Sequence, residues 1–200
     1  MTAVEIAKHN PLVGEWQTFY VYDTEYHWSC YKQNITLDDK TTLVYAAKCR
    51  KKSSMLNDPD KPPVEMYRED DSLVGVSNWH RTMLHGKSFM FFSDLECNHA
   101  IATMCHERVI EALAGRYVLQ LKTGAKFVWK HDLETESLAG EIYELVNDEG
   151  NTIAVYNDLP RLLNGRKDGR IHVKTEVESS LKENIILTAV ALMHMRNEES

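Results

Sequence analysis

The chain has 200 residues, of which 26% are charged and 43% are hydrophobic. That balance is typical of a globular protein and excludes a disordered or fibrous one. Its 23 Lys and Arg face 30 Asp and Glu, which gives a formal charge of -7, so a nucleic-acid partner is not expected and any anion site must be local. We predict one domain that spans residues 1–200.

The N-terminal residues and the cysteines indicate the compartment. Residues 1–10 include Glu5, Lys8 and His9, which do not fit a cleavable signal peptide. No Cys-x-x-Cys pair occurs among the four cysteines, which are Cys30, Cys49, Cys97 and Cys105. We therefore expect free thiols in a cytoplasmic protein.

Short runs of aromatic and β-branched residues, separated by polar clusters, predict strands in the first half of the chain. The runs are 16–22, 27–37, 41–47, 72–76 and 88–95. Residues 51–63 are charged and contain three prolines, and since proline removes a ladder donor, they are expected to form an exposed loop inside the domain. Residues 97–113 fit neither a strand nor a helix period.

Two hairpins are expected in the second half. Alternating apolar residues predict strands at 117–121, 127–129, 142–146, 152–156 and 171–173. Thr123-Gly124 supplies a turn for the first hairpin, and 147–150, rich in Asn, Asp and Gly, supplies the loop of the second.

A buried helix is predicted near residues 181–195. Ser180 and Glu183 have the spacing of a capping box, which favours a helix start. The eleven residues from Ile185 to Met195 are nearly all apolar, without an amphipathic stripe. They would span roughly 16 Å as a helix, whereas a bilayer core is about 30 Å thick, so we expect a protein core and no transmembrane span. The residues expected to be enclosed are Ile185, Ile186, Leu187, Ala189, Val190, Leu192 and Met193.

The order of the later segments resembles the closing half of a tubby C-terminal-like domain, the family that includes phospholipid scramblases and LURP-one-related proteins. The segments that carry this resemblance are 127–131, 142–146, 152–156, 169–173 and 183–192. Residues 26–29 and 34–37 are similar to small fungal members of the group. The resemblance implies a mainly β (α+β) fold, a closed antiparallel barrel of about twelve strands around the C-terminal helix.

The resemblance also implies a function. Members of the family bind phosphoinositides or are named for lipid scrambling, so we expect a non-enzymatic module that binds anionic phospholipid headgroups at a membrane surface, as a peripheral protein. Two alternatives remain open: a scaffold for protein contacts through exposed aromatics such as Tyr67 and Trp79, and a scramblase-like lipid-handling protein.

Two basic clusters are candidates for headgroup binding. The first contains Lys48, Arg50, Lys51 and Lys52, and the second contains Arg161, Arg166, Lys167 and Arg170. The competing interpretation is that both are solvated strand ends or loops whose cations prevent edge pairing.

Catalytic and metal sites are not expected. The group Cys97, His99, Cys105 and His106, with His80 and His85 upstream, lacks regular zinc-ligand spacing, so packed thiols and surface histidines are favoured. His194 is expected to be a hydrogen-bonded core residue. Because no phosphate loop, nucleophile elbow or dinucleotide fingerprint occurs, we predict a non-enzyme without a cofactor.

Overall fold

The computed structural model describes residues 14–26, 30–37, 39–50, 62–82, 86–108, 115–131, 141–158 and 168–199. It contains twelve strands followed by one helix, α1 (Ser179–Glu199). The strands are β1 (Trp16–Tyr26), β2 (Cys30–Leu37), β3 (Leu43–Arg50), β4 (Val64–Arg68), β5 (Leu73–Thr82), β6 (Gly86–Phe92), β7 (Ala100–Arg108), β8 (Gly115–Leu121), β9 (Lys126–His131), β10 (Glu141–Val146), β11 (Thr152–Asp158) and β12 (Asp168–Lys174).

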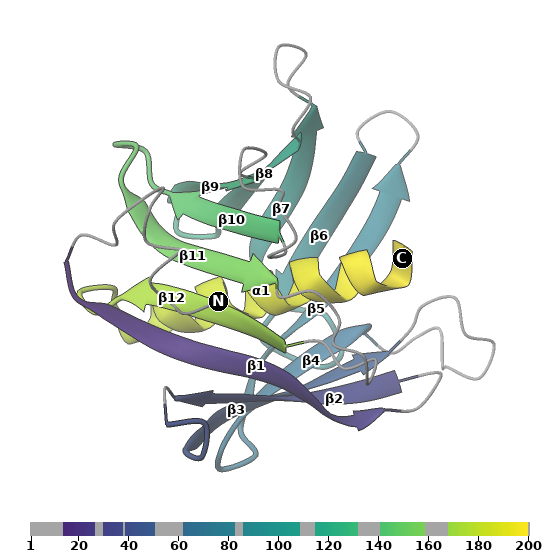
Figure 1. Ribbon diagram of the computed structural model, residues 1–200. Coiled ribbons are helices and arrows are strands. Elements are labelled where there is room, and N and C mark those ends of the chain that lie inside the picture. Colours follow the sequence, from purple (N-terminus) through teal and green to yellow (C-terminus); the bar gives the residue numbers. More distant parts are fainter. Residues whose placement is uncertain are drawn as a thin grey trace.

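Each strand pairs antiparallel with its neighbours in the chain, and β1 pairs with β12 to close the sheet into a barrel (Figure 1). The pleat sends alternate side chains to the inside and the outside, as in β2, where Tyr31, Gln33 and Ile35 are buried and Lys32 is exposed. The predicted closed antiparallel barrel with a C-terminal helix is confirmed. Both predicted hairpins, β8–β9 and β10–β11, are present.

Helix α1 is enclosed by the barrel. All residues from Ile185 to Met195 are buried, which includes the whole set predicted to be enclosed. Figure 1 shows α1 running with β11 and β12 on one side and β5 on the other. The Thr188 hydroxyl donates to the carbonyl oxygen of Ile185 at 2.9 Å and accepts from Trp129 Nε1 at 3.2 Å. The Thr188 hydroxyl, which is buried inside the barrel, therefore has both a donor and an acceptor as partners.

The start of α1 differs from the prediction. The helix begins at Ser179, and the Glu183 carboxylate contacts the guanidinium of Arg68 through two bonds of 2.7 Å. Arg68 is the last residue of β4, at the end of the barrel where α1 begins. The Glu183 carboxylate therefore anchors the helix to the barrel wall instead of completing a capping box.

Strand β4 was not among the strands that the residue pattern predicted. It is only five residues long, carries Glu65 and Arg68, and follows two prolines, so the apolar alternation is weak. Pro62 and Pro63 are buried, which corrects the expectation that the whole of 51–63 is an exposed loop. Residues 51–61 lie outside the described residues.

Candidate functional site

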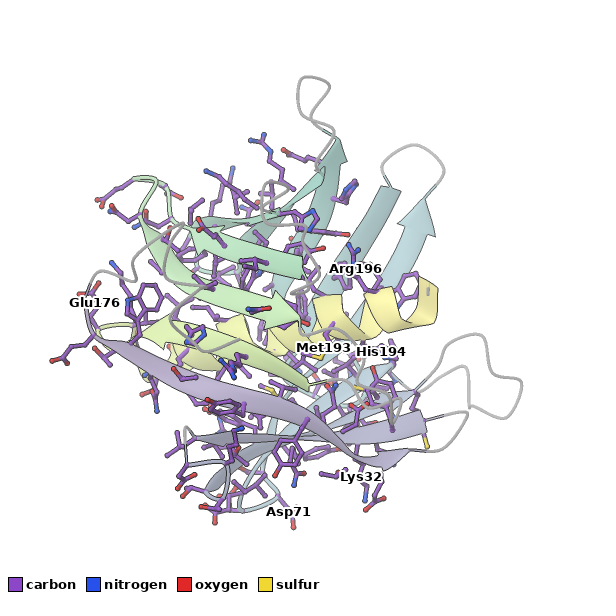
Figure 2. The ribbon with its side chains drawn as sticks, viewed as in Figure 1. Lys32, Asp71, Glu176, Met193, His194 and Arg196 are labelled. Atoms are coloured by element: carbon purple, nitrogen blue, oxygen red, sulfur yellow. The ribbon has the colours of Figure 1, made fainter. Side chains whose placement is uncertain are left out.

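The barrel has two rims that differ in composition. Odd-numbered strands end, and even-numbered strands begin, where α1 ends, and we call these strand ends the helix-end rim. The opposite strand ends lie where α1 begins and form the helix-start rim. Figure 2 shows Glu176 beside the start of α1 and His194 and Arg196 near its end. Antiparallel alternation alone assigns every connection to its rim.

The helix-start rim is acidic. Its described turn residues carry ten carboxylates against two amines, Lys40 and Lys122. The carboxylates are Asp39, Glu69, Asp70, Asp71, Asp94, Glu96, Asp148, Glu149, Glu176 and Glu178. Much of the net charge of -7 is therefore concentrated at one end of the molecule.

Three turn aspartates at the helix-start rim are held in the ionised form. Hydrogen bonds from the Thr42 hydroxyl and from the amides of Thr42 and Thr41 lower the pKa of Asp39 to about 2. The pKa of Asp70 is lowered by bonds from Ser72, and that of Asp94 chiefly by the amide of Asn98. These carboxylates complete their own turns and keep the rim negative.

Both predicted basic clusters connect to the helix-end rim. Residues 51–61 join the ends of β3 and β4, and residues 159–167 join β11 and β12. Because β12 lies three strands from β3 in the barrel order, three strand spacings, about 14 Å along the wall, separate these two strands. Five candidates fall outside the described residues: Lys51, Lys52, Arg161, Arg166 and Lys167.

Arg50 is buried and paired. Its Nη1 contacts Glu65 Oε1 at 2.6 Å and the carbonyl oxygen of Pro62 at 2.9 Å. The Tyr67 hydroxyl donates to the other Glu65 oxygen at 2.9 Å, and burial together with this bond raises the pKa of Tyr67 to about 12. Arg50 therefore fastens β3 to β4 and presents little surface to a ligand. Lys48, in contrast, is exposed on the outer wall opposite Lys32 and Glu65.

Arg170 lies on the outer wall of β12 and not in the connection that precedes it. Its guanidinium carbon is 5.2 Å from the centre of the Tyr20 ring, and Lys40 Nζ lies 4.7 Å from the same centre. Tyr20 and Arg170 face each other across β1 and β12, whereas Lys40 comes from the β2–β3 turn. No local sequence signal joins Tyr20 and Lys40 to Arg170, since only the strand register brings them together.

The inside of the barrel becomes polar around the end of α1. Tyr31 Oη lies 2.9 Å from His194 Nδ1, and Gln33 Nε2 donates to Asp23 Oδ1 at 3.1 Å. Arg196 Nη1 donates to the Tyr143 hydroxyl at 2.7 Å. His194 is fully buried and hydrogen-bonded, as predicted.

The cysteine and histidine pairs do not converge. Cys97 and His99 lie in the β6–β7 turn, where His99 contacts Asp94, while Cys105 is exposed on β7 and His106 packs on Tyr117. Within the described part of the chain, no group of three ligating side chains could hold a metal ion. His80 and His85 are outside the described side chains.

The aromatics expected to be exposed, Tyr67 and Trp79, are only partly exposed. Tyr67 is half-buried beside Glu65, and Trp79 is half-buried against the core. The described large hydrophobic side chains that are exposed are Met90 and Leu95, and two such residues do not make an interaction patch.

Comparison of the chain with protein-family models, curated proteins and solved structures finds no match. The likeness to the tubby group therefore stays a prediction. The helix that the structure describes is not long and apolar enough to cross a membrane.

Proposed function

We propose that this protein is a non-enzymatic, cytoplasmic binding module that docks its helix-end rim onto a membrane surface through anionic phospholipid headgroups, with phosphoinositides as the preferred class. The supporting observation is the charge difference between the rims. The acidic turns at the helix-start rim would be repelled by an anionic surface, so the molecule would approach with the opposite rim.

The distribution of cations around the helix-end rim supports the same orientation. The connections 51–61 and 159–167 hold the two clusters, and both adjoin the sector formed by β12, β1, β2 and β3. The acidic connections 109–114 and 132–140 join strands β7–β10, in the other sector. A headgroup with several phosphates would thus meet the basic sector first.

The candidate residues are not equivalent in this proposal. Lys48 is exposed and has no carboxylate partner among the described residues, so it is available to a headgroup. Arg50 is occupied by Glu65 and serves to hold the strand ends. Lys51, Lys52, Arg166 and Lys167 are the residues to test first, because they belong to the two connections that hold the basic clusters.

Vesicle co-sedimentation tests the proposal. We expect the protein to sediment with phosphatidylcholine vesicles that contain phosphatidylinositol bisphosphate, and less so as salt rises. The double variants Lys51→Ala with Lys52→Ala and Arg166→Ala with Lys167→Ala should each weaken binding roughly tenfold or more, at about 1 kcal/mol per cation.

The matched control removes two cations elsewhere. Lys122 and Lys126 are exposed at the β8–β9 hairpin, at or next to the helix-start rim, and replacing both with Ala should leave sedimentation unchanged. If the intact protein does not sediment at low salt, or if the control pair weakens binding as much as the other two pairs, the proposal is wrong.

The scaffold alternative named Tyr67 and Trp79 as contact residues, and both are half-buried. A scramblase-like activity is tested in the same vesicles, by asking whether a fluorescent lipid changes leaflet when the protein binds. We expect binding without transfer.

A further inference from the structure

A row of polar side chains crosses the outer wall of the barrel on four adjacent strands. Register places Asn157 of β11 opposite Arg170 of β12, Arg170 opposite Tyr20 of β1, and Tyr20 opposite Thr36 of β2. Lys40 reaches the same row from the β2–β3 turn, over the Tyr20 ring. Five residues from distant parts of the sequence thus form one surface feature, hereafter the wall row.

Three polar atoms of the wall row are buried without a hydrogen-bond partner in the structure: Asn157 Oδ1, Arg170 Nε and Thr36 Oγ1. Thr36 is 1% exposed and Asn157 is 3% exposed, although both side chains point outward. Buried polar atoms are nearly always paired, and those that are not call for an explanation such as a bound group.

Neither cation of the wall row has an acidic partner among the side chains that the structure describes. Arg170 and Lys40 form no ion pair with a carboxylate of the described residues, and both lie against one uncharged ring. Asp39, next to Lys40 in the sequence, accepts hydrogen bonds from the amides of Thr41 and Thr42. Two like charges within about 10 Å of each other repel, and an anion between them removes that repulsion.

We propose that the wall row is a binding site for a phosphate monoester that carries a free hydroxyl group. A monoester dianion matches the two positive charges of Arg170 and Lys40. The Arg170 Nε–H and the Thr36 hydroxyl donate to phosphate oxygens, while a hydroxyl of the ligand donates to Asn157 Oδ1. Before the ligand binds, both cations lie against the Tyr20 ring.

Access is through the exposed side of the row. Lys40 is exposed, and Tyr20 and Arg170 are half-buried, so the long Lys40 and Arg170 side chains must turn outward from the ring to take a phosphate. A single cation–π contact at an exposed position contributes only about 0.5–1 kcal/mol, less than the roughly 1.5–3 kcal/mol of a charged hydrogen bond. The exchange is therefore favourable.

This site is on the wall and is independent of membrane docking by the helix-end rim, apart from Arg170, which belongs to both sets of candidates. The phosphate could be carried by a soluble molecule or by a lipid headgroup. Titration with inorganic phosphate and with glycerol phosphate, followed by amide NMR, tests the soluble form. We expect shifts at Tyr20, Thr36, Asn157 and Arg170, with tighter binding of glycerol phosphate because it supplies the hydroxyl.

Three single variants are matched to the argument. Arg170→Lys keeps the charge but lacks Nε, Lys40→Ala removes a charge, and Thr36→Val removes the hydroxyl at nearly constant shape. Each of the first two should weaken glycerol phosphate binding about tenfold, which corresponds to about 1.4 kcal/mol, and Thr36→Val should weaken it less. Lys126→Ala, an exposed cation on β9, is the control and should bind normally.

The phosphate titrations and the vesicle experiments distinguish the wall row from the membrane-docking rim. Loss of vesicle binding in the Lys51 and Lys52 double variant, with phosphate binding retained, would keep the two sites distinct. If Lys40→Ala also weakens sedimentation with phosphatidylinositol bisphosphate vesicles, the lipid headgroup occupies the wall row as well. No shifts with either phosphate, or unchanged affinity in both Arg170→Lys and Lys40→Ala, would overturn the inference.

Discussion

The two rims of the barrel have the same number of connections, but the side-chain contacts at each rim have different roles. At the helix-start rim, Asp39, Asp70 and Asp94 accept bonds from the backbone of their own turns, and Arg68 clamps Glu183 of α1. At the helix-end rim, the interior around α1 carries polar contacts such as Tyr31 to His194. The described contacts of the helix-start rim hold its own turns and the start of α1, whereas the proposed binding surface is the helix-end rim.

The comparison also shows how net charge can mislead. A chain with a formal charge of -7 would be expected to avoid anionic surfaces. Most of that charge lies in the turns of one rim, so the opposite rim experiences a different local field. Steering depends on this distribution more than on the sum.

Helix α1 connects the rims, so a charge in its middle should destroy both. Leu187 is fully buried and faces Gly75 of β5. Leu187→Asp should leave the protein unfolded, because an unpaired buried carboxylate costs several kcal/mol or more. Circular dichroism should show no cooperative melting transition. Leu95→Asp, in an exposed turn, is the control and should fold; a soluble, cooperatively melting Leu187→Asp protein would show that α1 is not enclosed.

Gly75 tests how closely α1 approaches the wall between the rims. A Cβ there would lie 2.9 Å from the carbonyl oxygen of Phe92 and 3.0 Å from Leu187 Cδ2. Gly75→Ala should therefore lower the free energy of unfolding by roughly 1–3 kcal/mol. Urea titration measures this, with Thr103→Ala on the exposed face of β7 expected to change it by less than about 0.5 kcal/mol. Equal stability of Gly75→Ala and the wild type would contradict the close contact.

Tyr31 tests the polar end of the helix alone. Tyr31→Phe removes the hydroxyl that bonds His194 inside the barrel and should cost about 1 kcal/mol or slightly more, since His194 stays buried. The turn at Asp39, far from this pair, should keep its amide shifts. If Tyr31→Phe also changed the amide shifts of the helix-start rim, the two rims would not be independent.

Protonation of Asp39 is expected to change stability least, and its effect should be confined to the acidic helix-start rim. The pKa of Asp39 in the folded protein is lowered to about 2 from the ordinary value of 3.8. Its stabilising contribution is therefore present above pH 3.8 and is lost as the pH falls through about 2. An NMR titration of the carboxyl carbon should give a midpoint near 2, and Thr42→Val should move that midpoint upward. An unchanged midpoint in the variant would remove Thr42 as the main cause.

Much of the barrel could be predicted from its sequence where the local signal was strong. The hairpins β8–β9 and β10–β11 combine alternation with turn residues, and the helix from Ile185 is apolar on every side. Strand β4 could not be predicted, because two of its five residues are charged, and their ion-pair partners lie on β3 and α1.

The wall row illustrates what the sequence does not contain. Tyr20, Thr36, Asn157 and Arg170 meet through the registers of three strand pairs, and Lys40 joins them through a turn. No spacing rule connects such positions, whereas the basic clusters were visible as runs. Antiparallel alternation assigns both clusters to one rim, but only closure of the barrel through β1 and β12 brings them within three strands of each other.

The orientation on a membrane can be measured with the chain's own thiols. Cys30 begins β2 at the helix-end rim, whereas Cys97 lies in the β6–β7 turn at the helix-start rim. Cys49 is fully buried and can remain unlabelled. Burial and two nearby carboxylates raise the pKa of Cys97, so its labelling needs a more alkaline buffer.

Two variants are needed, each of which keeps only one of these two reactive cysteines and carries a fluorophore on it. The quenching of its fluorescence is measured with vesicles that contain phosphatidylinositol bisphosphate and brominated lipid, since the bromine quenches a label that lies at the membrane. The account predicts strong quenching of the label at Cys30 and little at Cys97. Equal quenching at both positions, or stronger quenching at Cys97, would contradict docking by the helix-end rim.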